Sequence, residues 1–343
     1  MSDSTNSRKM EHVRILKEDA ETDRQTQAFD RIHLRHRALP ELNLEEVDPS
    51  VTFLGKKLSF PLLISSMTGG GHADLLKMNR NLAEAAERCQ VAMGVGSQRV
   101  MFTHPEAEDS FRLREVAPTA LLFGNLGAVQ LNKGFGLAEC EAAVRILDAD
   151  GLFLHLNPLQ EAVQPEGDTC FAGLADKIET LARELSVPVI VKEIGTGISV
   201  PDAELLVARG IQLIDVAGSG GTSWSRIEHH RRQTLNGDGL GLLFQDWGTP
   251  TPEALIHLSH LRENMGLTLI ASGGLRNALD MVKSVILGAS LTGMAKPFLE
   301  PALESADAVV QVIEDLKRAF ITAMFLLGTP TLRELKGNGD LIL

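Results

Sequence analysis

The chain has 343 residues, with 33 Lys plus Arg against 45 Asp plus Glu, which gives a formal charge of −12 at pH 7. Its 44% hydrophobic and 23% charged residues exclude a disordered or fibrous protein. The acidic balance argues against a surface that coats nucleic acid. Tyrosine is absent, which excludes chemistry that depends on a phenol.

The cysteines and the N-terminus indicate the compartment. Cys89, Cys140 and Cys170 form no CxxC pair, which is typical of thiols in a reducing environment. Residues 1–17 are polar and have no apolar core like that of a signal peptide, and no run is long enough to span a bilayer. We therefore expect a soluble, cytoplasmic protein that contacts neither membrane nor nucleic acid.

Short apolar runs recur along the chain, and each is followed by an amphipathic stretch. The predicted strands cover residues 61–67, 91–96, 120–127, 151–157, 188–194, 213–219, 268–273 and 287–294. The predicted helices include residues 74–89, 137–147, 170–185, 252–263 and 275–285. Continuous hydrophobicity is typical of parallel strands buried on both faces, and one βα unit recurs about every 30 residues. Eight units predict an α/β protein with a (β/α)8 TIM barrel. A doubly wound sheet is the alternative, which the lack of GxGxxG after the first strand disfavours.

Two segments depart from the repeat. Residues 1–60 precede the first strand and form an N-terminal extension to a barrel domain at 61–343. Residues 220–250, between the sixth and seventh strands, show little periodicity and predict a long loop. A connection of this length is usually a lid, an active-site loop or a subunit contact, and a disordered insertion is the alternative.

Small, polar or charged residues follow every predicted strand, where a barrel builds its active site. After the seventh strand, Ser272-Gly273-Gly274 opens a helix, and Ala295-Lys296 follows the eighth. Backbone N–H groups at helix starts bind phosphate, so these ends predict a phosphate site. Arg276 would add a charged contact there, or lie solvated as an ordinary helix residue.

Lys192 ends the fifth predicted strand and points into the barrel mouth, where an unpaired charge is costly. Three interpretations stay open: an ion pair with Glu193, a Schiff-base lysine, or a cation beside the N1–C2=O edge of a flavin. In the loop after the fourth strand, Glu161 is a candidate Mg²⁺ ligand or a solvated carboxylate. His155 alone is more often a hydrogen-bonded histidine than a catalytic one.

These residues resemble the type 2 isopentenyl-diphosphate delta-isomerase family, whose members depend on flavin. The matching stretches lie between residue 8 and about residue 296. They are Arg8-Lys9-x-x-His12, Ser66-Met-Thr-Gly-Gly70, Gly94-Val-Gly-Ser-Gln-Arg99, Gly124-Asn125, His155-Leu-Asn-Pro-Leu-Gln-Glu161, Lys192-Glu193, Gly220-Gly-Thr-Ser-Trp224 and Ser272-Gly-Gly-Leu-Arg276. The combination is specific, although each glycine pair alone is not.

The resemblance implies an FMN barrel that converts isopentenyl diphosphate to dimethylallyl diphosphate in isoprene biosynthesis, with Mg²⁺ and with NADPH as the flavin reductant. The residues that would hold FMN are Ser66, Met67, Thr68, Ser97, Asn125, Lys192, Ser219, Thr222, Gly273, Gly274, Ala295 and Lys296. The residues that would bind the diphosphate substrate are Arg8, Lys9, Arg99, His155 and Asn157. Gln160 would contact the allyl carbons and transfer a proton, and Glu161 would bind Mg²⁺.

The chemistry agrees with these implied roles. Moving an unactivated double bond requires protonation of one carbon and deprotonation of another, through a cationic transition state. Trp224 would stabilise that cation through its π face, or be an ordinary core residue. Arg8, Lys9 and His12 would fold over an active face of their own or a neighbouring subunit, or belong to a disordered tail. We expect a homo-oligomer.

Two other functions stay open. An FMN-dependent 2-hydroxy-acid oxidase has a similar barrel but uses active-site tyrosines, and here it would need His229 or His230 with Arg231. A non-catalytic phosphate-binding barrel is the other alternative. Polar residues at all eight strand ends argue against it.

Overall fold

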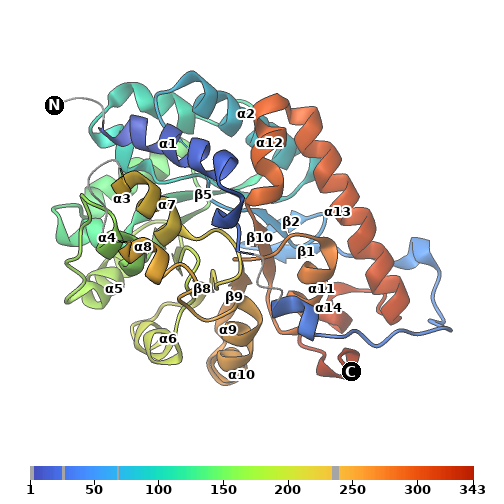
Figure 1. Cartoon of the computed structure of the whole chain (residues 1–343). Helices are drawn as coiled ribbons and strands as arrows, with labels where there is room; N and C mark the ends of the chain where they lie inside the picture. The colour runs from blue at the N-terminus through green and yellow to red at the C-terminus, as the bar shows by residue number, and fades with distance from the viewer. Residues whose placement is uncertain (1–3, 25–27, 68, 234–238) are drawn as a thin grey trace.

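The computed structural model describes residues 4–24, 28–67, 69–233 and 239–343. Eight parallel strands close a barrel in chain order, because β10 pairs with β3 as well as with β9. The strands are β3 (Leu62–Ile64), β4 (Ala92–Gly94), β5 (Leu121–Gly127), β6 (Gly151–His155), β7 (Val189–Lys192), β8 (Leu213–Asp215), β9 (Thr268–Ala271) and β10 (Leu291–Met294). Each lies within one of the eight predicted runs, so the predicted (β/α)8 barrel is confirmed (Figure 1).

Helices follow the strands along the chain and bury side chains against the barrel or against neighbouring helices. They are α2 (Ala73–Cys89), α3 (Leu137–Leu147), α4 (Pro158–Val163), α5 (Leu174–Glu184), α6 (Val200–Val207), α9 (Thr251–His257), α10 (Ser259–Met265), α11 (Ala278–Ile286), α12 (Lys296–Glu304), α13 (Ala306–Leu327) and α14 (Leu332–Leu335). The single helix predicted at 252–263 is two helices that meet at Leu258. Among the described residues, none of the helices has the length and apolar character that crossing a membrane requires.

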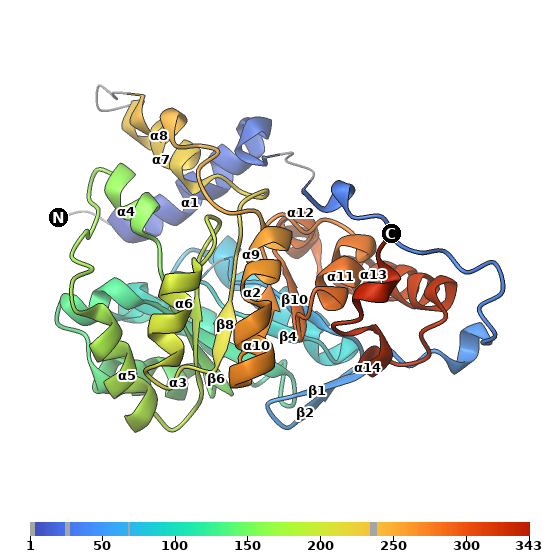
Figure 2. The same cartoon turned by 90° about the horizontal axis from the view of Figure 1, so that it is seen from below.

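The hairpin of β1 (Val51–Phe53) and β2 (Lys56–Leu58) closes the amino end of the barrel. Phe53 and Leu58 pack into the inner core with Phe123 and Phe153, and Figure 2 shows the hairpin on the side of the barrel opposite α1. Inward-facing side chains fill a small barrel completely, so this end is a plug and not a pore.

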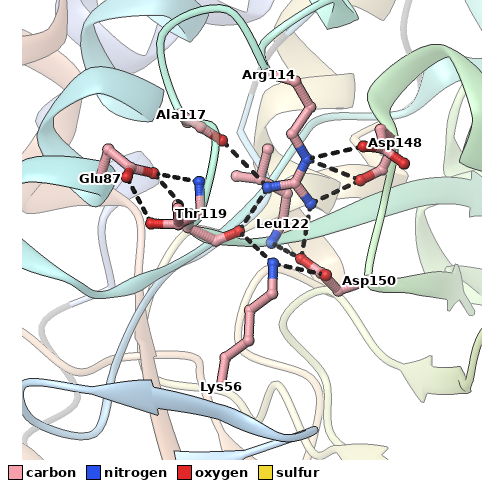
Figure 3. A network of polar contacts seen from close by, with 9 residues as sticks. Lys56, Glu87, Arg114, Ala117, Thr119, Leu122, Asp148 and Asp150 are labelled. Atoms are coloured by element: carbon pink, nitrogen blue, oxygen red, sulfur yellow. Dashed lines mark hydrogen bonds and ion pairs between the residues drawn. The ribbon is translucent and has the colours of Figure 1, made fainter.

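A polar network lies beside the hairpin and includes its residue Lys56 (Figure 3). Lys56 and Arg114 both pair with Asp150, with Nζ–Oδ1 at 2.7 Å and Nη2–Oδ2 at 2.8 Å. The Arg114 guanidinium also donates to the carbonyls of Ala117, Ala120 and Asp148. The network thus ties together the segments that precede β5 and β6.

The segment 220–250 is less irregular than its sequence predicts. It contains α7 (Trp224–Gln233) and α8 (Leu240–Leu243). The sequence does not indicate α7 because this helix buries polar side chains, including Ser225, Glu228 and His229, beside Ile227. A helix whose buried face is polar leaves no apolar periodicity in the sequence.

The first helix, α1 (Ser4–Glu18), lies over the carboxyl end of its own barrel and packs against α7 (Figures 1 and 2). Asp19, which follows α1, accepts hydrogen bonds from Arg226 Nε and His230 Nε2, both at 2.6 Å. The N-terminal segment therefore covers the mouth and is held there by α7.

Candidate active site

A cavity of about 260 Å³ opens at the carboxyl end of the barrel, between the strand ends and α1. Residues that follow all eight strands line it. Most predicted site residues are in this lining, namely Lys9, Ser66, Met67, Ser97, Arg99, Asn125, His155, Asn157, Gln160, Glu161, Lys192, Thr222, Trp224, Gly273, Gly274, Arg276, Ala295 and Lys296. Ser219 is buried beside the lining residue Gly218 but is not part of it. Thr68 and the side chain of Arg8 lie outside the described part of the chain.

The ammonium group of Lys192 is buried, and its anionic partner is Asp215. Lys192 Nζ lies 3.4 Å from Asp215 Oδ2, and Lys192 and Asp215 are paired positions on β7 and β8. Ser272 Oγ donates to the other Asp215 oxygen at 2.7 Å. The three side chains form a polar unit at the base of the cavity, which holds a positive charge where it is shielded from water.

Glu193 is not the ionic partner of Lys192, although its side chain was one predicted candidate. Lys192 Nζ donates instead to the backbone carbonyl of Glu193 at 2.7 Å. The Glu193 carboxylate turns away and accepts the N–H groups of Ile194, Gly195 and Thr196. Burial raises the pKa of Glu193, and these three hydrogen bonds oppose that shift. Glu193 therefore shapes the loop after β7.

Glycines form an anion cradle at the ends of β9 and β10. Gly273 has φ +91°, and a Cβ there would lie 2.1 Å from the Gly218 carbonyl oxygen, so no other residue fits. Ala295 and Lys296, at the start of α12, line the same cavity, and a helix start is a common site for a phosphate group. The Arg276 guanidinium lines the cradle and pairs with Asp23 of the N-terminal segment.

Gln160 belongs to a polar unit that also contains Glu228, a residue that sequence reasoning missed. Gln160 Nε2 donates to Glu228 Oε1 at 2.9 Å, and His12 Nε2 lies 3.1 Å from the same oxygen. Burial opposes ionisation of Glu228, but hydrogen bonds from His12 and Gln160 and the charge of Arg231 lower its pKa to about 2. The Glu228 carboxylate is thus buried, at 0% exposure, among donors and a cation that favour its charged form.

An aromatic wall lies next to this unit. The Trp224 ring lines the cavity and meets the His12 ring edge-on, with centroids 5.3 Å apart. Leu16 and Met67 add apolar surface to the same cavity. The cavity therefore combines an apolar wall with a buried negative charge, which favours a ligand whose reacting part is a hydrocarbon.

Cationic side chains lie at another part of the lining. Lys9 Nζ donates to the carbonyls of Gly69 and Ser97, and Arg99 Nη1 pairs with Asp168 Oδ2 at 3.1 Å. His155 Nδ1 is 2.7 Å from Asn125 Oδ1. Two cations and a histidine at one cavity are typical of a site for an anionic group such as a diphosphate.

Glu161 is buried and hydrogen-bonded. Its Oε1 accepts from Asn157 Nδ2 at 2.8 Å, and its Oε2 accepts from Gln164 Nε2 and from the Asp168 N–H. Asn157 Oδ1 is buried beside it without a hydrogen-bond partner. No cluster of three or more His, Cys, Asp or Glu side chains suited to a metal occurs in the described residues. The donors fit a Mg²⁺ ion that takes its other ligands from a bound phosphate group and water.

Comparison with known proteins places the chain in a family. A protein from Paracoccus zeaxanthinifaciens named isopentenyl-diphosphate delta-isomerase is 56% identical, over 98% of this chain and 96% of its own length. Namesakes from Hydrogenovibrio crunogenus and a Nostoc strain are 53% and 47% identical, each over at least 97% of both chains. This chain belongs to the isopentenyl-diphosphate delta-isomerase family.

The cofactor class follows from a second comparison. The family model described as FMN-dependent dehydrogenase matches residues 3–104 and 172–340. Among solved structures, the flavin-binding domain of baker's yeast flavocytochrome b2 has a TM-score of 0.68 and 18% identity, over 100% of this chain and 91% of that chain. A mandelate oxidase mutant has a TM-score of 0.62 and 16% identity, over 98% and 92%. At these identities the two structures show the shared fold alone.

The described residues of the mouth fit FMN. Ser65 Oγ and Ser66 Oγ are buried, line the cavity and have no hydrogen-bond partner, so both hydroxyls are available to a ligand. The glycine cradle suits a phosphate, and Lys192 contributes a positive charge to the same cavity. The family's cofactor and the chemistry of the lining thus agree.

Proposed function

We propose that this protein converts isopentenyl diphosphate to dimethylallyl diphosphate with FMN, a step of isoprenoid biosynthesis. One observation carries the proposal: Gln160, hydrogen-bonded to the buried Glu228, lies with Trp224 in a cavity that also presents Lys9 and Arg99. The alkene would occupy the part near Trp224, and the diphosphate would bind the cations.

The Gln160 amide is held from two sides. Its Nε2 donates to Glu228, and its Oε1 accepts from Asn157 Nδ2 at 3.0 Å. We assign Gln160 to proton transfer at the allyl carbons. The buried Glu228 charge would stabilise the positive charge that develops there, because few waters screen it. The Trp224 ring would stabilise the same charge through its π face.

The diphosphate end uses the residues around Arg99. Lys9, Arg99, His155 and Asn157 would bind the phosphate oxygens, together with Arg8. Glu161 would bind Mg²⁺ that bridges to the diphosphate. Closure by α1, which carries both Lys9 and His12, would exclude water from the cationic transition state.

The flavin end uses residues at the strand ends that line the same cavity. Ser66, Ser97, Asn125, Thr222, Gly273, Gly274, Ala295 and Lys296 would hold FMN, with contributions from Met67, Thr68, Ser219 and Arg276. FMN, when bound and reduced by NADPH, would supply negative charge and an exchangeable proton next to the alkene. Lys192, fixed by Asp215, would keep that negative charge in place.

An anaerobic assay tests the proposal. Purified protein is incubated with FMN, Mg²⁺, NADPH and isopentenyl diphosphate, and the allylic isomer is measured by mass spectrometry or NMR. We expect product only when FMN and a reductant are both present, and less of it with EDTA. Absence of product, together with peroxide release from a hydroxy acid in air, would overturn the proposal.

Gln160→Ala separates catalysis from cofactor binding. We expect turnover to fall by about 10² to 10⁴, the range of general acid–base catalysis, with an unchanged spectrum of the bound flavin. Loss of FMN from this variant would contradict the assigned role.

The hydroxy-acid oxidase alternative lacks support in the site. His230 binds Asp19, and Arg231 pairs with Glu11, Glu166 and Glu228. Neither these two residues nor His229 is part of the cavity lining. We further propose a cytoplasmic homo-oligomer, which sedimentation of the purified protein would test.

A further inference from the structure

After α1, a single 3₁₀ turn (Ala20–Thr22) leads the chain to Asp23 and Arg24, which lie beside the loop after β8. Asp23 and Thr222 form an antiparallel bridge. The Arg24 N–H donates to the Gly221 carbonyl at 3.0 Å, and the Ser223 N–H donates to the Thr22 carbonyl at 2.7 Å. The N-terminal segment thus continues the backbone hydrogen bonding of the barrel mouth.

The Arg24 side chain is buried, at 9% exposure, and its partners are backbone carbonyls from three separate loops. The guanidinium donates to Gly195 at 2.7 Å, to Gly221 at 3.2 Å and Thr222 at 3.3 Å, and to Gln245 at 3.1 Å and Trp247 at 3.4 Å. Arginine carries five N–H donors in one rigid plane, whereas lysine has three donors on a single atom. The arrangement therefore requires an arginine.

The loops that Arg24 joins form one wall of the cofactor cradle. A Cβ on Gly221 would lie 2.7 Å from the Gly274 N–H nitrogen, so the two backbones are in close contact. Gly195, Gly221 and Thr222 all line the cavity, whereas Arg24 does not. Its neighbour Asp23 pairs with Arg276, on the other wall of the cradle.

We propose that Arg24 is a positioning residue for the flavin site. Its guanidinium sets the distance between the loops after β7 and β8, and thereby places Gly221 and Thr222 against Gly273 and Gly274. The cradle is then complete only when residues 19–24 are docked. The inference rests on the proposed function for the identity of the cofactor, but not for the reaction.

The test measures FMN binding directly. Arg24→Ala and Arg24→Lys are compared with Arg114→Ala, in which a half-buried arginine that also binds backbone carbonyls is removed from the other end of the barrel. FMN is titrated into each apoprotein and its dissociation constant is read from flavin fluorescence, while the melting temperature of the apoprotein is recorded separately.

We expect R24A to weaken FMN binding at least about tenfold and R24K to recover only part of the loss, with methylguanidinium restoring affinity to R24A. R114A should lower the melting temperature and leave the FMN dissociation constant within about twofold.

Unchanged FMN affinity in R24K and R24A, with lowered melting temperatures alone, would overturn the inference and make Arg24 a stabilising residue only. If R24A does not fold, R24K decides, since it keeps the charge and changes the donor geometry. The titration needs no substrate. Failure of the isomerase assay therefore leaves its result intact.

Discussion

The two ends of the barrel contain similar polar residues that are used differently. At the amino end, Arg114, Asp150 and Lys56 bind one another and the neighbouring backbone (Figure 3). At the carboxyl end, Ser65, Ser66 and Asn157 present buried oxygen atoms without hydrogen-bond partners. An unsatisfied buried polar atom costs about 1 to 3 kcal/mol. The polar groups of the amino end thus stabilise the fold, whereas some polar groups of the carboxyl end are left to bind ligands.

This difference predicts that substitutions at the two ends of the barrel will affect different properties of the protein. Substitutions at the amino end should lower stability and leave flavin binding and turnover alone. Substitutions at the mouth should do the reverse. Three predictions test this separation, and a fourth tests the junction that holds α1 over the mouth.

Glu228→Gln should have the largest effect. The variant keeps the shape of the side chain but removes the negative charge that holds Gln160 and His12. We expect kcat of the isomerase reaction to fall about 100-fold with little change in KM, measured by steady-state kinetics at saturating FMN. Glu166→Gln, which alters an exposed partner of the same Arg231, is the control and should stay within about twofold. A kcat for E228Q within threefold of wild type would refute the role.

Asp150→Ala should cause the largest loss of stability among substitutions at the amino end. It removes the shared acceptor of Lys56, Arg114 and the Leu122 N–H. We expect the free energy of unfolding to fall by about 2 kcal/mol, measured by urea denaturation. The FMN dissociation constant should not change. A weakened flavin site in this variant would break the separation of the two ends.

Two serines on either side of β3 give a smaller, matched comparison. Ser59 Oγ donates to the Cys89 carbonyl at 2.6 Å, whereas Ser66 Oγ has no partner. We expect Ser59→Ala to lower stability by about 1 kcal/mol without affecting FMN. Ser66→Ala should leave apoprotein stability unchanged or slightly higher and weaken FMN binding about fivefold. Equal behaviour of the two variants in titration and denaturation would contradict the comparison.

The smallest expected effect is a pH dependence at the junction of α1 with α7. Burial alone would raise the pKa of Asp19, but hydrogen bonds from Arg226 and His230 outweigh it and lower the pKa to about 2. A pKa below the unfolded value near 3.9 means that Asp19 stabilises the fold above that pH and loses this contribution as the pH falls toward 2. The difference in urea midpoint between wild type and Asp19→Asn should therefore be constant at pH 5 to 7 and shrink between pH 4 and 2. A difference that grows on acidification would show the opposite sign.

The fold and the lining of the cavity were predictable because parallel barrel strands produce a simple pattern in the sequence. Runs such as 151–157 and 188–194 are continuously apolar, since both faces are buried, and they break into polar residues at the carboxyl end. His155 and Lys192 stand at those breaks and line the cavity. The assigned contacts with FMN, substrate and Mg²⁺ remain predictions.

Other parts of the site had weaker signals or none. Asp215 interrupts the apolar run Leu213-Ile-Asp-Val-Ala217 and is paired with Lys192 on the neighbouring strand. This charge within an apolar run was a signal in the sequence for the partner of Lys192. Glu228 lies on a helix without apolar periodicity, and its partners are 68 and 216 residues away. Arg24 binds carbonyls, which every residue has, so no sequence pattern marks its partners.

The docking of α1 onto α7 has a consequence for protein synthesis. His12 is made 216 residues before its partner Glu228, which at about 5 to 20 residues per second is roughly 10 to 40 s. During that interval the first helix lacks α7, against which it packs, although the strands made earlier can already form. The N-terminus leaves the ribosome first, but its helix can dock only after α7 has been made. A nascent chain therefore cannot close its active site before nearly two thirds of the chain has been translated.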